Sequence, residues 1–182
     1  MACIGEISAS LSMPCGAPVR ADLSRPVSAK ILNAAAIKSF TVDPGNIAAI
    51  TLVSGKVGYG VTVDNNSLVV TVGLKSQDII PGAYDVAITF KSFSGAHTLQ
   101  SGANPMGIAD TLTHAELVIV VDHGDAIRVY GLGAPLVCTE MSGDSSASAY
   151  VTYTFGVEDW QVGTTIHYMN REDYDALNSP AT

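Results

Sequence analysis

Residues 116–131 read as two strands joined by a tight polar turn. The first strand, Glu116-Leu-Val-Ile-Val-Val121, is apolar at every position after the glutamate, and the second, residues 126–131, alternates apolar and polar positions. The residues Asp122-His-Gly-Asp125 connect them and suit a β-hairpin turn. A short continuous apolar run bounded by turn residues is typical of a strand covered on both faces. We therefore expect this hairpin to lie in the core, with the other strands packed around it.

Turn residues separate short apolar runs along most of the chain. Asp43-Pro-Gly-Asn46 and Asp64-Asn-Asn-Ser67 separate apolar runs, since proline presets φ and glycine or asparagine tolerates positive φ. Short β-branched runs between such turns predict an antiparallel all-β domain, either a sandwich or a barrel. Besides the hairpin, strands are predicted at residues 27–32, 37–42, 47–53, 57–63, 68–74, 84–90, 136–141, 150–157 and 166–169.

Several segments depart from this strand pattern. The first residues are broken by glycine and proline and predict an arm, which lies either on a neighbouring subunit or over its own domain. A small-residue stretch after the sixth strand predicts a long loop, and Asn104 then suits the N-cap of a helix that begins with proline. The predicted organisation is an arm at residues 1–26, a β-sandwich domain at 27–177 with a loop at 91–104, a short helix at 105–115 and a helical turn at 170–177, and a loose C-terminal tail at 178–182.

Composition points to extensive burial between copies of the chain. Of the 182 residues 47% are apolar and only 14% are charged, with a mean hydropathy of +0.30, whereas a typical soluble domain is about 25% charged. The longest apolar run covers residues 117–121, far short of the roughly 20 residues of a membrane helix. We therefore expect no membrane span and a homo-oligomer with buried subunit interfaces.

The charge balance argues against direct binding of nucleic acid. The net charge is −8 with a pI of about 4.7, and the nine lysines and arginines are scattered singly. No basic stripe is available to hold phosphates. An acidic surface can nevertheless face nucleic acid if its task is to repel it.

The cysteines and the N-terminal residues indicate the cellular compartment in which the protein is made. Cys3, Cys15 and Cys138 form an odd set without a C-x-x-C motif, which argues against a disulfide framework and a zinc site. The N-terminus carries Glu6 and no basic segment followed by an apolar run, so we expect no secretory signal and synthesis in the cytoplasm.

One turn offers a possible chemical site. Asp122-His-Gly-Asp125 places an imidazole between two carboxylates, as in a metal site or an acid–base pair, but a hairpin requires the same residues for its turn. The other candidates lack the spacing that chemistry needs. We therefore predict no catalytic, cofactor-binding or metal-binding residue and no enzyme activity. These other candidates are Asp64-Asn-Asn66, which resembles part of a calcium loop, the turn Ser142-Gly-Asp-Ser145, the glycine pair Gly131-Leu-Gly133, and the histidines His97, His114 and His167, which lack H-x-x-x-H spacing.

A family resemblance sharpens this picture. The first sequence features on which it rests are Met1-Ala-Cys3 followed by Cys15, and the strand Ile47-Ala-Ala-Ile-Thr-Leu52 leading into Gly55-Lys56. The hairpin at residues 117–132 follows, and then the polar turn at 142–148 with the strand at 150–155. In the order and position of these features, the chain resembles the major tail tube proteins of tailed bacteriophages, most closely those of phages infecting Bacteroidetes.

This resemblance implies a structural virion protein of the phage tail, made in the host bacterial cytoplasm. Subunits would form rings, hexameric in that family, which stack into a hollow tube and bind other tail proteins. One sheet of each subunit would join its neighbours edge to edge and close an inner barrel without free edges. Genomic DNA would pass through this acidic-lined lumen during ejection without specific binding. The arm and the loop at residues 91–104 would contact adjacent subunits or rings.

Other functions remain open from the sequence. Another virion β protein, such as a capsid decoration or tail-terminator protein, would share the same composition. A β-sandwich adhesin or carbohydrate-binding module should expose clustered aromatic residues on loops, yet Trp160 is the only tryptophan and most tyrosines lie in strand patterns.

Overall fold

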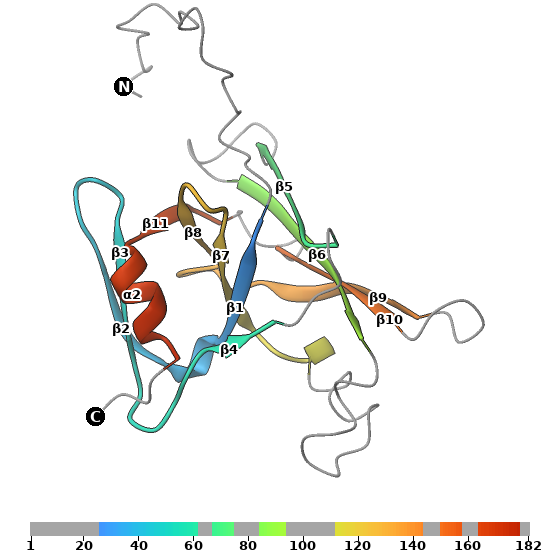
Figure 1. Ribbon diagram of the computed structural model, residues 1–182, viewed down its shortest axis with the longest axis horizontal. Coiled ribbons are helices and arrows are strands. Elements are labelled where there is room, and N and C mark those ends of the chain that lie inside the picture. The colour runs from blue at the N-terminus through green and yellow to red at the C-terminus, as the bar shows by residue number, and fades with distance from the viewer. Residues whose placement is uncertain are drawn as a thin grey trace, which may run out of the picture.

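Antiparallel strands dominate the computed structural model, which describes residues 26–61, 67–74, 84–93, 112–143, 150–157 and 164–178. Within these residues the strands form a five-stranded sheet, a four-stranded sheet and a two-stranded hairpin, followed by a short C-terminal helix (Figure 1). The all-β class expected from the sequence is therefore confirmed.

The five-stranded sheet has the strand order β11-β8-β7-β1-β4, and each neighbouring pair is antiparallel. β1 and β7 pair along their full length, from Ser28 opposite Asp122 to Asn33 opposite Leu117. β7 and β8 form the central hairpin predicted from the sequence, with Asp122 opposite Ile127 beside the turn. The strands are β1 (Ser28–Asn33), β4 (Tyr59–Gly60), β7 (Leu117–Asp122), β8 (Ile127–Tyr130) and β11 (Ile166–Met169).

The four-stranded sheet has the order β5-β6-β10-β9 and is also antiparallel throughout. Isolated bridges join the two sheets at two corners, between Tyr84 and Thr164 and between Leu117 and Leu136. These bridges make the sandwich partly barrel-like. The strands are β5 (Val69–Leu74), β6 (Tyr84–Phe93), β9 (Val137–Gly143) and β10 (Tyr150–Gly156).

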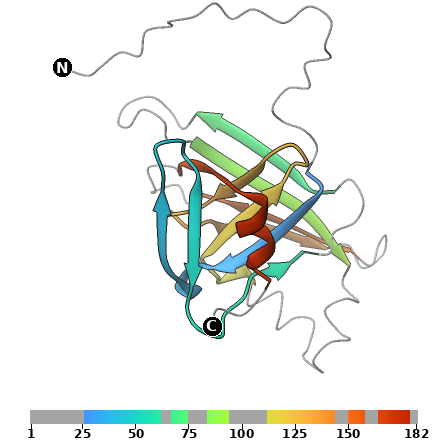
Figure 2. The same ribbon diagram turned by 60° about the vertical axis from the view of Figure 1, so that its left-hand side comes forward.

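A third layer covers the other face of the five-stranded sheet. It consists of the hairpin formed by β2 (Ile37–Val42) and β3 (Ala48–Leu52), together with helix α2 (Arg171–Ala176). The short 3-10 helix η1 (Ala34–Ala36) turns the chain from β1 into β2. Figure 2 shows the hairpin and the helix together on one side of the five-stranded sheet.

Two apolar cores result from this three-layer arrangement. Alternate residues of β7 point to opposite faces. Leu117, Ile119 and Val121 enter the first core, which lies between the two sheets. Val118 and Val120 enter the second core, which lies beneath the hairpin and α2. All of them are at most 1% exposed. The prediction that this continuous apolar strand lies in the core with cover on both faces is confirmed, and its position in the middle layer explains its composition.

Several predicted boundaries need correction. β8 was expected to have one polar face, but all four of its residues are buried, including Arg128 at 8% exposure. The strand predicted at residues 57–63 is reduced to Tyr59–Gly60 within the described residues, because the preceding backbone turns away and the Gly58 N–H donates to the Leu177 carbonyl at 2.7 Å. Residues 62–66 lie outside the described residues.

The predicted loop at residues 91–104 starts too early. β6 continues through Phe93 because Tyr150, Val151 and Thr152 of β10 extend the ladder to its last three residues. Of the helix predicted at 105–115, Leu112 and Thr113 are helical, and the helix has ended before residue 115. The rest of that loop and helix, the arm at 1–25 and the tail at 179–182 lie outside the described residues. The helical turn predicted at 170–177 is confirmed as α2.

Candidate functional site

The turn Asp122-His-Gly-Asp125 owes its shape to local hydrogen bonds. Asp122 Oδ1 accepts the Gly124 N–H at 2.8 Å, and the His123 N–H donates to the Ala126 carbonyl at 2.9 Å. A carboxylate that accepts the backbone N–H two residues later stabilises a turn. This geometry gives the Asp122 carboxylate and the His123 backbone a role in shaping the turn between β7 and β8.

The Asp122 carboxylate also binds Arg171, the first residue of α2. Arg171 donates from Nη1 to Oδ2 at 2.5 Å and from Nη2 to Oδ1 at 2.9 Å. The Asp122 side chain is 9% exposed and the Arg171 side chain 51%. The hydrogen bonds from the guanidinium lower the pKa of Asp122 below its usual value, despite partial burial. The pair therefore holds an ionised carboxylate at the rim of the second core and anchors α2.

A buried lysine lies beside this ion pair. Lys30 of β1 is 5% exposed, donates from Nζ to the Tyr174 carbonyl, and places Nζ 3.9 Å from the centroid of the Tyr174 ring. Ser28 Oγ and the Tyr174 hydroxyl are 2.9 Å apart. Burial lowers the pKa of Lys30. The cluster of Ser28, Lys30, Asp122, Arg171 and Tyr174 fastens α2 to the five-stranded sheet, and its polar groups are used in that attachment.

The imidazole of the turn has a different partner. His123 is 3% exposed, and its Nε2 lies 3.3 Å from the hydroxyl of Tyr130, which is fully buried. Burial raises the pKa of Tyr130, against the opposing effect of a hydrogen bond from Arg128. Within this turn Asp122 binds Arg171 and His123 contacts Tyr130, so both side chains have structural partners on different elements.

His167 belongs to a link between β11 and the β2–β3 turn. Its Nδ1 lies 2.5 Å from Asn46 Oδ1 and its Nε2 lies 2.8 Å from Thr165 Oγ1. Asn46 adopts a positive φ of 62° and also donates from Nδ2 to the Ile166 carbonyl at 2.8 Å. Burial lowers the pKa of His167. This histidine therefore helps to position the hairpin over the sheet.

The structure describes some of the remaining sequence candidates and not others. His114 lies 3.1 Å from the Thr113 hydroxyl through its Nδ1, and Cys138 is a half-buried thiol whose pKa burial raises. His97, Cys3, Cys15 and the turns at 64–66 and 144–145 lie outside the described residues. Within the part of the chain that the structure describes, no three histidine, cysteine, aspartate or glutamate side chains gather as metal ligands do.

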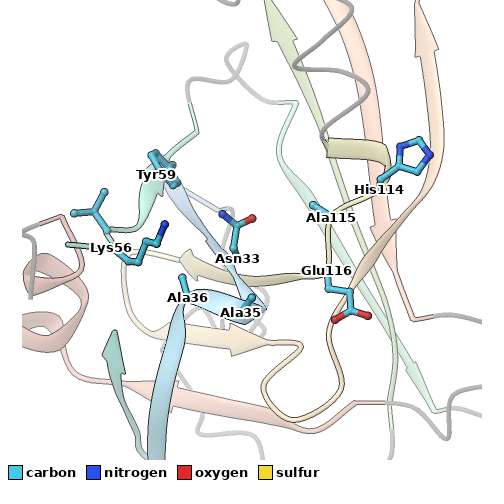
Figure 3. Close-up of a pocket in the computed structure, with 9 residues that line it drawn as sticks. Asn33, Ala35, Ala36, Lys56, Tyr59, His114, Ala115 and Glu116 are labelled. Carbon is cyan, nitrogen blue, oxygen red and sulfur yellow. The ribbon is translucent and has the colours of Figure 1, made fainter. Parts of the chain in front are cut away.

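An open cleft of about 470 Å³ lies beside η1. Lys56 and Tyr59 stand on one side of it and His114 and Glu116 on the other, with the alanines of η1 between them (Figure 3). Its polar groups do not converge on one point in this view. Ligand sites usually combine an enclosed apolar cavity with a few convergent polar groups, so this cleft lacks the features of a small-molecule site.

The outer face of the four-stranded sheet offers a more extensive surface. Its residues alternate with those that enter the core between the sheets, and they are exposed or half-buried. Cross-strand pairs such as Thr89 and Thr154, whose hydroxyl oxygens are 3.1 Å apart, arrange it in rows. We define this outer face by Val69, Thr71, Asp85, Ala87, Thr89, Lys91, Thr139, Glu140, Thr152 and Thr154.

The edges of the two sheets differ. In the four-stranded sheet β5 and β9 each pair on one side only, within the described ranges. The β11 edge of the other sheet is partly covered, because the Tyr168 N–H donates to the Asn46 carbonyl at 2.9 Å. Edge strands with open hydrogen-bonding groups are templates for pairing with another chain. Within the described ranges, the four-stranded sheet therefore has such an edge on each side.

No helix within the described ranges combines the length and the apolar character needed to cross a lipid bilayer.

Comparisons with known proteins give no relative from which a role could be transferred. No protein-family model, no curated protein and no solved structure matches the chain. The function must therefore be argued from the sheets, edges and charges described above.

Proposed function

We propose that this protein is a structural subunit of a bacteriophage tail, which self-assembles into stacked rings that form the tail tube and conduct DNA during ejection. The observation that carries the proposal is the four-stranded sheet β5-β6-β10-β9, with an edge strand on each side and an exposed outer face. Joining β5 of one copy to β9 of the next extends one sheet around a ring. Closure of that ring removes the free edges of this sheet.

The side chains of the outer face suit the lining of a channel. Most are small and neutral, and the charged ones are Asp85, Glu140 and Lys91, which leave an excess of one carboxylate. A surface with one isolated lysine offers phosphates no basic stripe. Nucleic acid would therefore slide past this face without a strong electrostatic attachment.

The five-stranded sheet fits an outer position in such a tube. Both of its faces are already covered, one by the four-stranded sheet and the other by the β2–β3 hairpin and α2. It can support the lining sheet but cannot itself line a lumen. The chain's low charge and its exposed apolar side chains, including Val69 at 50% and Met141 at 43% exposure on the edge strands, agree with burial between copies.

Electron microscopy of the purified full-length protein tests the proposal. We expect stacked rings or long hollow tubes at high concentration. Single closed rings that do not stack would favour a tail-terminator role, and stable monomers at high concentration would overturn assembly altogether.

A matched pair of variants tests the edge. Val69→Lys combined with Thr71→Lys places charges on edge strand β5, which should prevent edge pairing and leave folded monomers. Thr152→Lys places a charge on the same face of the inner strand β10 and should leave ring formation intact. Circular dichroism and thermal unfolding confirm that each variant folds. Tubes formed equally well by the β5 double variant would exclude edge pairing through β5.

A further inference from the structure

The β2 strand has an exposed apolar side that the described residues leave open. Among the described strands it pairs with β3 alone, and each of its residues after Ile37 is exposed. Phe40 is 45% exposed and Val42 is 39% exposed. Exposed apolar residues that gather on one edge strand mark an interaction surface more often than scattered ones do.

The register shows which face of the hairpin these two side chains occupy. Val42 lies opposite Ala48 and Phe40 opposite Ile50, and directly opposed residues share a face. Ala48 and Ile50 pack in the second core, so Phe40 and Val42 belong to the same inner face. Both side chains are nevertheless exposed, so the inner face of β2 is apolar and open at these positions.

The outer face of β2 is different in character. Ser39 and Thr41 alternate with Phe40 and Val42, and both are exposed. A strand added to the free edge of β2 would therefore need apolar residues on one face and small hydroxyl residues on the other. Charged residues would be unsuitable on the inner side.

One segment of the chain has this pattern. Residues 7–13 read Ile-Ser-Ala-Ser-Leu-Ser-Met, with apolar side chains at four odd positions, serines at the three even positions and no charge. Strict alternation over seven residues is typical of a half-buried strand. This segment matches the two faces of β2 residue by residue.

We propose that residues 7–13 of a neighbouring copy add as a strand to the free edge of β2. Their apolar side chains pack on Phe40 and Val42, and their serines continue the hydroxyl face of Ser39 and Thr41. Backbone hydrogen bonds along the edge supply affinity and the alternating side chains supply register, as in other strand additions.

The connection is long enough for the strand to come from a neighbouring copy. Residues 14–25 include Pro14 and Pro18 and lead to Pro26 at the start of the domain. Prolines favour extended chain of about 3.1 Å per residue, so these twelve residues span up to about 37 Å. This length carries residues 7–13 to another subunit. The inference rests on the proposed self-assembly for the identity of that subunit.

Disulfide cross-linking of the full-length chain tests this pairing. In a background with Cys3→Ser, Cys15→Ser and Cys138→Ser, each of Ser8→Cys, Ser10→Cys and Ser12→Cys is combined with Ser39→Cys. One of these combinations should give covalent dimers and higher oligomers on a non-reducing gel. The matched control combines Ala9→Cys with Ser39→Cys and should cross-link much less, because the two thiols then lie on opposite faces.

Three results would overturn the inference. Absence of cross-links from all three serine positions excludes the pairing, and a cross-link confined to monomers means that the segment binds its own domain. Dimers formed by Ser39→Cys alone mean that two β2 edges pair with each other. Electron microscopy of the same samples separates the two proposals: tubes without cross-links reject only the strand addition, and cross-linked oligomers without tubes reject only the tail tube.

Discussion

Arg171 and Asp122 lie 49 residues apart in the chain and form an ion pair through two hydrogen bonds of 2.5 and 2.9 Å. This contact joins the first residue of α2 to the last residue of β7. It assigns a structural role to the carboxylate that the sequence places next to a histidine. The four-stranded sheet thus covers one face of the central hairpin, and helix α2 is attached to the other face.

Replacement of Asp122 by asparagine should reduce stability in a pH-dependent manner. The native pKa lies below the usual 3.8, chiefly because of the hydrogen bonds from Arg171. A lowered native pKa stabilises the folded state at pH values above the unfolded pKa, and this contribution is lost as the pH falls through the native pKa. Urea unfolding should show Asp122→Asn less stable than the unaltered protein by about 2 kcal/mol at neutral pH.

The difference between the two proteins should stay constant above about pH 5 and shrink as the pH falls through the lowered native pKa of Asp122. Asp43→Asn is a suitable control, because that carboxylate accepts only the exposed turn N–H of Ile47. A difference that does not change with pH would show that Asp122 contributes little as a carboxylate.

Gly58 should not tolerate a side chain. A methyl group there would lie 2.8 Å from Leu32 Cδ2 and 3.3 Å from the Leu177 carbonyl oxygen, and Leu32 is fully buried. We expect Gly58→Ala to destabilise the protein by about 2 kcal/mol through overpacking. Gly60→Ala is the matched control, since a methyl group at Gly60 meets no atom within 4 Å. Equal unfolding midpoints for the two variants would show that Leu32 and Leu177 do not approach Gly58 this closely.

Alanine substitutions at Gly131 and Gly133, which have nearly the same φ, distinguish backbone strain from steric clash. Gly131 has φ of 85° and Gly133 has φ of 84°. A methyl group at Gly131 would lie 2.9 Å from the Leu117 carbonyl oxygen, whereas one at Gly133 would be 4.0 Å from the Phe40 ring. Gly133→Ala should cost about 1 kcal/mol from backbone strain alone, and Gly131→Ala about 3 kcal/mol because the clash is added. Thermal unfolding of both variants measures the difference.

Local patterns in the sequence account for most of the strands. β2 and β11 were predicted with the bounds that the structure has, and the central hairpin was predicted within one residue at the start of each strand. Turn residues and period-two alternation are local signals, so they are readable without knowledge of partners. The apolar run in β7 also indicated cover on both faces.

Contacts between distant residues could not be predicted in the same way. Lys30 lies in an alternating strand, and nothing near it indicates that Tyr174, 144 residues later, covers it. Arg128 was expected on a polar face but is buried, because it shares a face of β8 with Tyr130 and the four-stranded sheet covers that face. Strand order and the choice of edge strands depend on the whole topology, so the edges of the four-stranded sheet became visible only in three dimensions.

The same substitution at two valines tests the middle layer. Val120 is fully buried in the second core, whereas Val69 is 50% exposed on the edge strand β5. Valine and threonine have nearly the same shape, so Val120→Thr adds a buried hydroxyl beneath the hairpin and α2 and should cost about 2 kcal/mol. Val69→Thr should change the free energy of unfolding by less than about 0.5 kcal/mol. Comparable urea midpoints for the two variants would show that the hairpin and α2 do not exclude water from the face of the five-stranded sheet to which Val120 points.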